Sequence, residues 1–379
     1  MASRPRGNRA QRTDSTESTD STESPDGTGS TPRSQRAARS RRAHRTHRTL
    51  LAVLVTASVA VPVSGAARPA AVPAPAPAPA ALAPLRDLAP AALDTRYAVN
   101  RAGIRAAERM AAGHGDHVRA AALRVMADPA RHFLSFDGRD GGRTAEVFGD
   151  LARAGRIAVL VPGSDTGLDH YARFGAGAAA LRREMGTGAA VVAWLGYRAP
   201  ATVSPAVLTA GRADEAAPGL RSFVAGLAAA APAARVSLLC HSYGSVVCAR
   251  AAPGLPVADL VLYGSPGTGV DRAAALRTGA TIWAGRGSAD RIAGVPHGRL
   301  RLPFVTIGFG RDPVSEAFGA RIFDAGGSAH SGYLRPGSVS LRNMARIATG
   351  AMDTGGTATG GTPAGSSRAG TPTREAGRA

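Results

Sequence analysis

The feature that most constrains this chain is a series of short apolar runs separated by segments of helical length. Each run is bounded by Gly, Pro or polar residues, as is typical of strands buried on both faces. Strands that alternate with helices predict an α/β domain, with a mostly parallel central sheet flanked by helices. The predicted strands are residues 134–136, 145–148, 157–161, 190–194, 236–239, 260–263, 281–283 and 304–307, and the predicted helices include residues 95–128, 206–230, 243–252, 270–277 and 338–349.

The N-terminal end has the composition of an export signal. Residues 1–48 are rich in Arg, Ser, Thr and acidic residues and end in a basic cluster, which an apolar stretch at 50–63 and small residues up to Ala66 follow. This order predicts a signal peptide over residues 1–66 with a long basic n-region, and a protein that is secreted or held in the cell envelope. The apolar stretch is shorter than a membrane span requires. An uncleaved segment that associates with the membrane is the alternative.

The remaining boundaries follow from composition. Residues 67–90 are rich in Pro and Ala, which predicts a stiff, extended linker. The α/β domain is expected over residues 91–349. Residues 350–379 are mostly Gly, Thr, Ser and Ala and predict a disordered tail.

The strong positive charge does not indicate a nucleic-acid partner. The formal net charge is +19, and all 46 basic residues are Arg. Basic surfaces attract polyanions whatever the fold. Here the Arg residues of the domain are scattered among acidic residues, with no interleaved aromatics and no basic stripe on one predicted helix, so no nucleic-acid binding is expected.

The only two cysteines are Cys240 and Cys248. Cys240 is expected to end a strand, and Cys248 to lie two turns along the following helix. That spacing predicts a Cα separation above the roughly 7 Å limit for a disulfide. Both are therefore expected to be small buried hydrophobic residues.

The most specific motif is Leu-Leu-Cys-His-Ser-Tyr-Gly-Ser-Val-Val at 238–247, in which an apolar strand enters a tight turn and a helix follows. This context is typical of a nucleophile elbow, whose strained turn exposes a serine hydroxyl at the carboxyl edge of the sheet. Small residues must flank that serine because strand and helix approach closely. Gly244 satisfies this, whereas Cys240 stands where Gly is usual. The motif predicts Ser242 as a nucleophile; the alternative is a serine that merely caps the helix.

A serine hydroxyl needs a base within hydrogen-bond reach. In folds with a nucleophile elbow, the catalytic residues occur along the chain in the order Ser, acid, His. Asp290 follows the predicted strand at 281–283, and His330 lies beyond the last predicted strand, so these two are expected as acid and base. Asp312 also lies between Ser242 and His330 and stays open as the acid. Three other histidines are less suitable: His170 and His297 are less well placed, and the turn holds His241 beside the serine without facing it.

Acyl transfer also needs donors aimed at the oxyanion. The backbone N–H of Tyr243, directly after the serine, is expected to be one donor. The other is expected from Ser164, in the loop after the strand at 157–161, where Gly163 permits close approach of the backbone. The alternative is a plain strand-to-helix turn. Residues 197–217 follow the end of a predicted strand on the same side of the sheet as the predicted site. They are therefore a candidate lid.

Taken together, these motifs resemble a poorly characterised group of bacterial α/β-hydrolases with a GHSYGS-type elbow. The resemblance spans roughly residues 95–350 and implies the α/β-hydrolase fold and the Ser, Asp, His order, which carry onto Ser242, Asp290 and His330. It supplies no substrate, and Cys240 departs from the group's elbow. The matching pieces are RYAVNR at 96–101, FLSFD at 133–137, VLVPGSDT at 159–166, WLGYRAP at 194–200, HSYGSVV at 241–247, LYGSPGTGV at 262–270, FGAR at 318–321 and HSGYL at 330–334.

The sequence thus predicts a secreted serine hydrolase that acts on a carboxylic ester, either a small molecule or a lipid, with an amide or a thioester as the less favoured substrate. No cofactor and no metal are expected, because the sequence shows neither a metal-ligand cluster nor a dinucleotide-binding loop. The alternative is a catalytically inactive hydrolase-fold protein that serves as a binding module at the cell surface.

Overall fold

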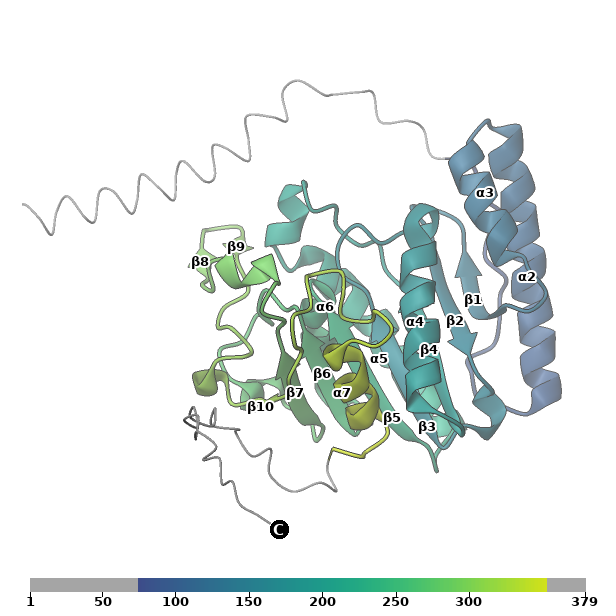
Figure 1. Ribbon diagram of the computed structural model, residues 1–379. Coiled ribbons are helices and arrows are strands. Elements are labelled where there is room, and N and C mark those ends of the chain that lie inside the picture. The colour runs from purple at the N-terminus through teal and green to yellow at the C-terminus, as the bar shows by residue number, and fades with distance from the viewer. Residues whose placement is uncertain (1–73, 353–379) are drawn as a thin grey trace, which may run out of the picture. The chain divides into compact units, whose positions relative to one another are not determined.

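The computed structural model describes residues 74–352, which are built around an eight-stranded sheet (Figure 1). The strand order is β1-β2-β4-β3-β5-β6-β7-β10; β2 is antiparallel to both its neighbours, and the other pairs are parallel. The mostly parallel sheet predicted from the apolar runs is confirmed. The strands are β1 His132–Asp137, β2 Arg143–Phe148, β3 Arg156–Val161, β4 Ala189–Leu195, β5 Arg235–His241, β6 Asp259–Tyr263, β7 Thr281–Gly285 and β10 Arg321–Ile322.

Helices cover both faces of this sheet. They are α2 Pro90–Gly113, α3 His117–Met126, α4 Tyr171–Met185, α5 Gly211–Ala230, α6 Gly244–Ala251 and α7 Val339–Ala348. Among the described residues, no helix is both long and apolar enough to cross a membrane. The predicted signal peptide over 1–66, most of the tail and the first part of the linker lie outside these residues. Residues 74–89 form neither helix nor strand, and Leu88 within them is buried.

Successive side chains of each central strand pack on opposite faces of the sheet. In β3, Ile157 and Val159 belong to one buried cluster with residues of α5 and α6, whereas Ala158 and Leu160 belong to another with residues of α4 and α7. Figure 1 shows α4 and α7 together on one side of the sheet. Because both faces of the strands are covered, the strands are continuous apolar runs rather than alternating ones.

The strand predicted at 304–307 is wrong. Only Thr306–Ile307 is extended, as β9, and it pairs with β8, Leu300–Arg301, in a separate antiparallel hairpin. The eighth strand of the main sheet is β10 instead. Its two residues are exposed at the sheet edge and need no apolar run, so no sequence pattern indicates this strand.

Three predicted helices are interrupted or shortened. The helix predicted at 95–128 breaks between α2 and α3, where Gly115 has a φ of 84° that few residues other than glycine adopt easily. The segment 206–230 divides into a short 3-10 turn at Pro205–Leu208 and α5. The segment 270–277 forms only a 3-10 turn at Ala273–Leu276.

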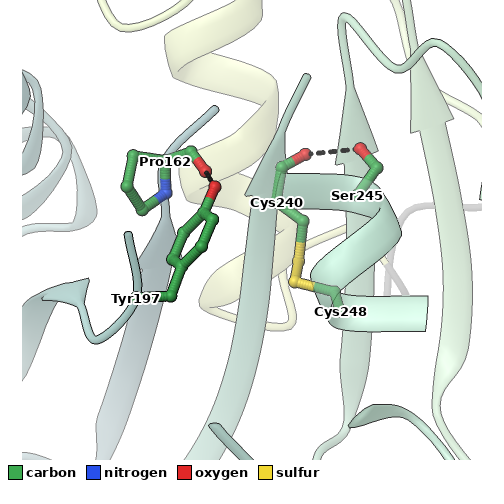
Figure 2. The surroundings of a disulfide bond; sticks show 5 residues. All are labelled: Pro162, Tyr197, Cys240, Ser245 and Cys248. Atoms are coloured by element: carbon green, nitrogen blue, oxygen red, sulfur yellow. Dashed lines mark hydrogen bonds between the residues drawn. A yellow bond between two sulfur atoms is a disulfide. The ribbon is translucent and has the colours of Figure 1, made fainter. Parts of the chain in front are cut away.

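Cys240 and Cys248 form a disulfide, which corrects the expectation of two unpaired cysteines (Figure 2). Their Cα atoms are 6.4 Å apart, within the range that a disulfide spans. The helix begins at Gly244, so Cys248 lies just over one turn along it rather than two. The sharp turn at Ser242 brings that first turn back against the end of β5. The bond therefore joins the strand before the turn to the helix after it.

Replacing both cysteines by alanine is expected to lower the free energy of unfolding by roughly 2–3 kcal/mol. Without the cross-link the unfolded chain gains conformational entropy, which stabilises it relative to the folded state. Urea unfolding of the wild type and of Cys240→Ala/Cys248→Ala measures the difference. Wild type unfolded in the presence of reductant serves as the matched control and should approach the variant. Equal stability of the oxidised wild type and the variant would contradict this expectation.

Candidate active site

Ser242 lies at the turn between β5 and α6 with a φ of 51°, a left-handed conformation that is unusual for a residue other than glycine. Its backbone N–H donates to the carbonyl of Tyr263 at the end of the neighbouring strand, at 3.0 Å. The serine is nearly buried, with 7% of its surface exposed. Strand, strained turn and helix together form the elbow that the sequence predicted, at the carboxyl edge of the parallel strands.

Two glycines allow the elbow to pack closely. A Cβ atom at Gly244 would lie 2.6 Å from the carbonyl oxygen of Pro162 and 2.7 Å from that of Val161. A Cβ atom at Gly163 would lie 2.7 Å from the Cβ of Ser242. Side chains at either position would therefore collide with backbone or with the serine itself. The loop after β3 lies directly against Ser242.

His330 and Asp290 lie in line with Ser242. The Nε2 atom of His330 is 2.9 Å from the Oγ of Ser242, and its Nδ1 atom is 2.9 Å and 3.0 Å from the two carboxylate oxygens of Asp290. A carboxylate only accepts, so Nδ1 carries the proton and Nε2 is free to accept from the serine hydroxyl. The structure thus brings together the three side chains that sequence order had selected, across 88 positions from serine to histidine.

Asp290 is buried and held as a carboxylate. Burial by itself would raise the pKa of Asp290, but hydrogen bonds from Tyr333, from the backbone N–H of Ile292 and from His330 outweigh it, so the pKa lies below its ordinary value. The Tyr333 hydroxyl donates to Oδ2 at 2.6 Å and accepts from the N–H of Gly287 at 3.0 Å. Tyr333 was not predicted as a functional residue; its place three positions after His330 was the available signal.

His241 forms a hydrogen bond with the backbone of the loop that carries His330. Its Nε2 atom donates to the backbone carbonyl of His330 at 2.7 Å, and the two rings lie 4.8 Å apart. Burial, together with the neighbouring His330, lowers the pKa of His241 to about 4. His241 is therefore neutral at physiological pH and holds the loop through a hydrogen bond rather than through charge.

The two expected oxyanion donors border the serine. Among the described residues, neither the N–H of Tyr243 nor that of Ser164 donates to another protein group, so both are free to bind a ligand oxygen. The loop that carries Ser164 is held in place by Tyr197, whose hydroxyl donates to the carbonyl of Pro162 at 2.7 Å (Figure 2). Stabilisation of an oxyanion requires N–H groups that are not already paired, and the role of these two stays a prediction.

Comparison with known proteins gives the family. A family model described as alpha/beta hydrolase matches residues 137–299. An uncharacterised protein of Mycobacterium bovis is 34% identical over 186 residues, which cover 43% of this chain and 70% of that relative. The chain belongs to the alpha/beta hydrolase family. An uncharacterised protein of Mycobacterium tuberculosis is 31% identical over 254 residues, 58% of this chain, and the chain spans only 38% of that longer relative.

Among solved structures, the chain is similar to an α/β serine hydrolase without lid from Xanthomonas campestris, at 20% identity and a TM-score of 0.39, covering 59% of this chain and 95% of that one. Another is the esterase LipW from Mycobacterium marinum, at 14% identity and a TM-score of 0.37, covering 70% and 91%. The assignment of this α/β hydrolase to its family depends on sequence.

The other candidates of the sequence lie in different surroundings in this α/β hydrolase. Asp312 accepts from Arg286 at 2.5 Å and lies 3.4 Å from the Nε2 of His297. His170 precedes α4. Asp290, and not Asp312, is therefore the carboxylate that contacts His330. Within residues 74–352, no three His, Cys, Asp or Glu side chains are grouped as ligands for a metal.

The candidate lid at 197–217 is tied down at both ends in this α/β hydrolase. Near its start, the backbone N–H of Thr202 donates to the Asp165 carboxylate at 2.8 Å. Near its end, the hydroxyl of Tyr243 donates to the carbonyl of Thr209 at 2.7 Å and accepts from the N–H of Ala213 at 3.2 Å. Both anchors belong to the serine's immediate neighbourhood, so the segment borders the site. Opening as a lid stays a prediction.

Proposed function

We propose that the protein is an exported serine hydrolase that cleaves carboxylic esters, with Ser242 as nucleophile, His330 as base and Asp290 as the residue that orients the base. The observation that carries the proposal is the unbroken line of contacts from Ser242 Oγ through His330 to Asp290, at 2.9 Å on each side of the imidazole. The same arrangement of hydroxyl, imidazole and carboxylate activates serine in unrelated hydrolase folds.

The first half-reaction transfers the acyl group to the serine. Ser242 Oγ attacks the carbonyl carbon of the ester while His330 Nε2 takes the hydroxyl proton. The resulting oxyanion accepts from the N–H groups of Tyr243 and Ser164. When the intermediate collapses, the carbon–oxygen bond to the leaving group breaks, and His330 returns the proton to the departing alcohol. The product on the enzyme is an acyl ester of Ser242.

The second half-reaction releases the acid. Water takes the place of the alcohol, His330 removes its proton, and the hydroxide attacks the acyl carbon. When the second tetrahedral intermediate collapses, the bond from the acyl carbon to Oγ breaks, His330 returns the proton to Oγ of Ser242, and the carboxylic acid is released. Throughout, Asp290 keeps Nδ1 protonated and stabilises the imidazolium that forms twice in each cycle.

The disulfide supports the exported part of the proposal. Disulfides form and persist in oxidising compartments outside the bacterial cytoplasm and are rare within it. The Cys240–Cys248 bond is fully buried beside the elbow. Together with the signal peptide predicted over residues 1–66, it favours a secreted or envelope location.

A panel of p-nitrophenyl esters of increasing acyl length, with a p-nitroanilide and a thioester, tests the proposed activity. The full chain should hydrolyse at least the shorter esters and turn over the anilide more slowly. Protein with Ser242 replaced by alanine, purified in parallel, gives the background. A folded protein that releases no product from any member would support the alternative, an inactive binding module at the cell surface.

A further inference from the structure

The β8–β9 hairpin carries a cluster of exposed apolar side chains that nothing in the proposed chemistry uses. The strands are joined by a turn closed by the N–H of Leu302 and the carbonyl of Val305, at 2.9 Å. Phe304 at the turn is fully exposed, and Leu300 is 59% exposed. We call residues 300–305 the hairpin tip. A contiguous apolar group of this kind on a protein surface marks an interaction site.

The charge around the hairpin tip indicates which partner it fits. Residues 291–311 contain four Arg and no Asp or Glu. Arg299 pairs with Asp271, but Arg291, Arg301 and Arg311 are exposed and form no ion pair with the part of the chain that the structure describes. At the base of the hairpin, Arg299 and Arg301 also line a cavity of about 160 Å³. Apolar side chains beside unpaired arginines suit the boundary between anionic headgroups and acyl chains.

The hairpin is attached to the surroundings of the nucleophile. Phe309, two residues after β9, packs edge-on against the ring of Tyr243, the residue that follows Ser242, with centroids 5.7 Å apart. The N–H of Gly308 donates to the carbonyl of Leu208 in the candidate lid, at 2.9 Å. In Figure 1 the hairpin stands apart from the helices that cover the sheet. The end of the hairpin is therefore connected to Tyr243 and to the candidate lid, both of which border the proposed site.

We propose that the hairpin tip docks on an anionic lipid surface, with Phe304, Leu300 and Leu302 inserted among the acyl chains and the arginines at the headgroups. Docking itself does not depend on catalysis. Its consequence, that membrane or aggregated lipid esters are delivered to Ser242, rests on the proposed function.

A tryptophan at the tip tests insertion directly. The native tryptophans, Trp194 and Trp283, are both buried, so Phe304→Trp supplies the exposed reporter. With vesicles of phosphatidylglycerol and phosphatidylcholine, its emission should shift to the blue and be quenched by lipids brominated on the acyl chain. Val118→Trp, at an exposed position on α3, is the matched control and should do neither. Equal quenching of both reporters, or of neither, would overturn the proposal.

A polar tip tests how much the apolar side chains contribute. Leu300→Ser/Leu302→Ser/Phe304→Ser should bind the same vesicles about tenfold more weakly or worse, while hydrolysis of a short soluble ester stays unchanged. Val118→Ser/Val125→Ser, two exposed valines of α3, should bind like wild type. Unchanged vesicle binding by the variant with the polar tip would overturn the proposal. If the variant instead bound vesicles like wild type but no longer self-associated, the partner of the tip would be a second copy of this chain. Vesicle binding without any ester turnover would leave docking intact and refute the proposed function alone.

Discussion

Replacing Ser242 by alanine is expected to lower kcat for ester hydrolysis by about 10⁴-fold or more, with little change in the folded structure. In the proposed mechanism the hydroxyl supplies the attacking oxygen, so its loss removes the acyl-enzyme route and leaves only binding and oxyanion stabilisation. Initial rates with a short p-nitrophenyl ester measure the effect.

Ser245 provides the matched control. It lies on the first turn of the same helix, and its hydroxyl donates to the carbonyl of Cys240 at 3.2 Å rather than facing His330 (Figure 2). Ser245→Ala should keep kcat within a few fold of wild type. A Ser242→Ala protein that retains most of the activity, or an equal loss in both variants, would contradict the assignment.

Replacing Asp290 by asparagine is expected to lower kcat by roughly 10³- to 10⁴-fold. The amide is neutral and presents an NH₂ group as well as an oxygen, so it neither fixes the Nδ1-protonated tautomer of His330 nor stabilises the imidazolium. It also disturbs the hydrogen bond from Tyr333, which now points at Oδ2. The kcat and KM of the variant with a soluble ester separate this loss from weaker substrate binding, since KM should change little.

Asp312→Asn is the comparison that separates the two carboxylates named from the sequence. Asp312 contacts Arg286 and His297 rather than His330, so its replacement should cost stability more than turnover. A kcat loss in Asp312→Asn that exceeds the loss in Asp290→Asn would mean that the triad acid was wrongly chosen.

The central strands were predictable because both of their faces are buried. β3 and β4 appear as unbroken apolar runs in the sequence, and their burial on two sides explains why. The same rule failed at 304–307, where apolar residues lie on an exposed hairpin. It also missed β10, whose two edge residues need no apolar character. Short apolar runs indicate burial only when tertiary contacts cover them, and those contacts are not local in the sequence.

In the candidate site, too, the features that depend on local sequence were predictable and those that depend on long-range contacts were not. The strand-turn-helix context of Ser242 is local, and chain order then selected two partners that prove to lie in contact with each other and with the serine. Tyr333 was missed because its role depends on a contact with Asp290 across 43 positions. The disulfide is not predictable from helix length alone, because the sharp turn at Ser242 folds the helix back on the strand and shortens the distance between the two cysteines.

The claim that Ser242 is an activated nucleophile is tested most directly by a fluorophosphonate probe, followed by mass spectrometry of the labelled peptides. The probe reacts only with a serine that a neighbouring base activates, so one adduct is expected, on Ser242. Labelling should become much slower in His330→Ala, while Ser245→Ala should react like wild type. A folded protein that takes up no probe, or takes it up on another serine, would contradict the account.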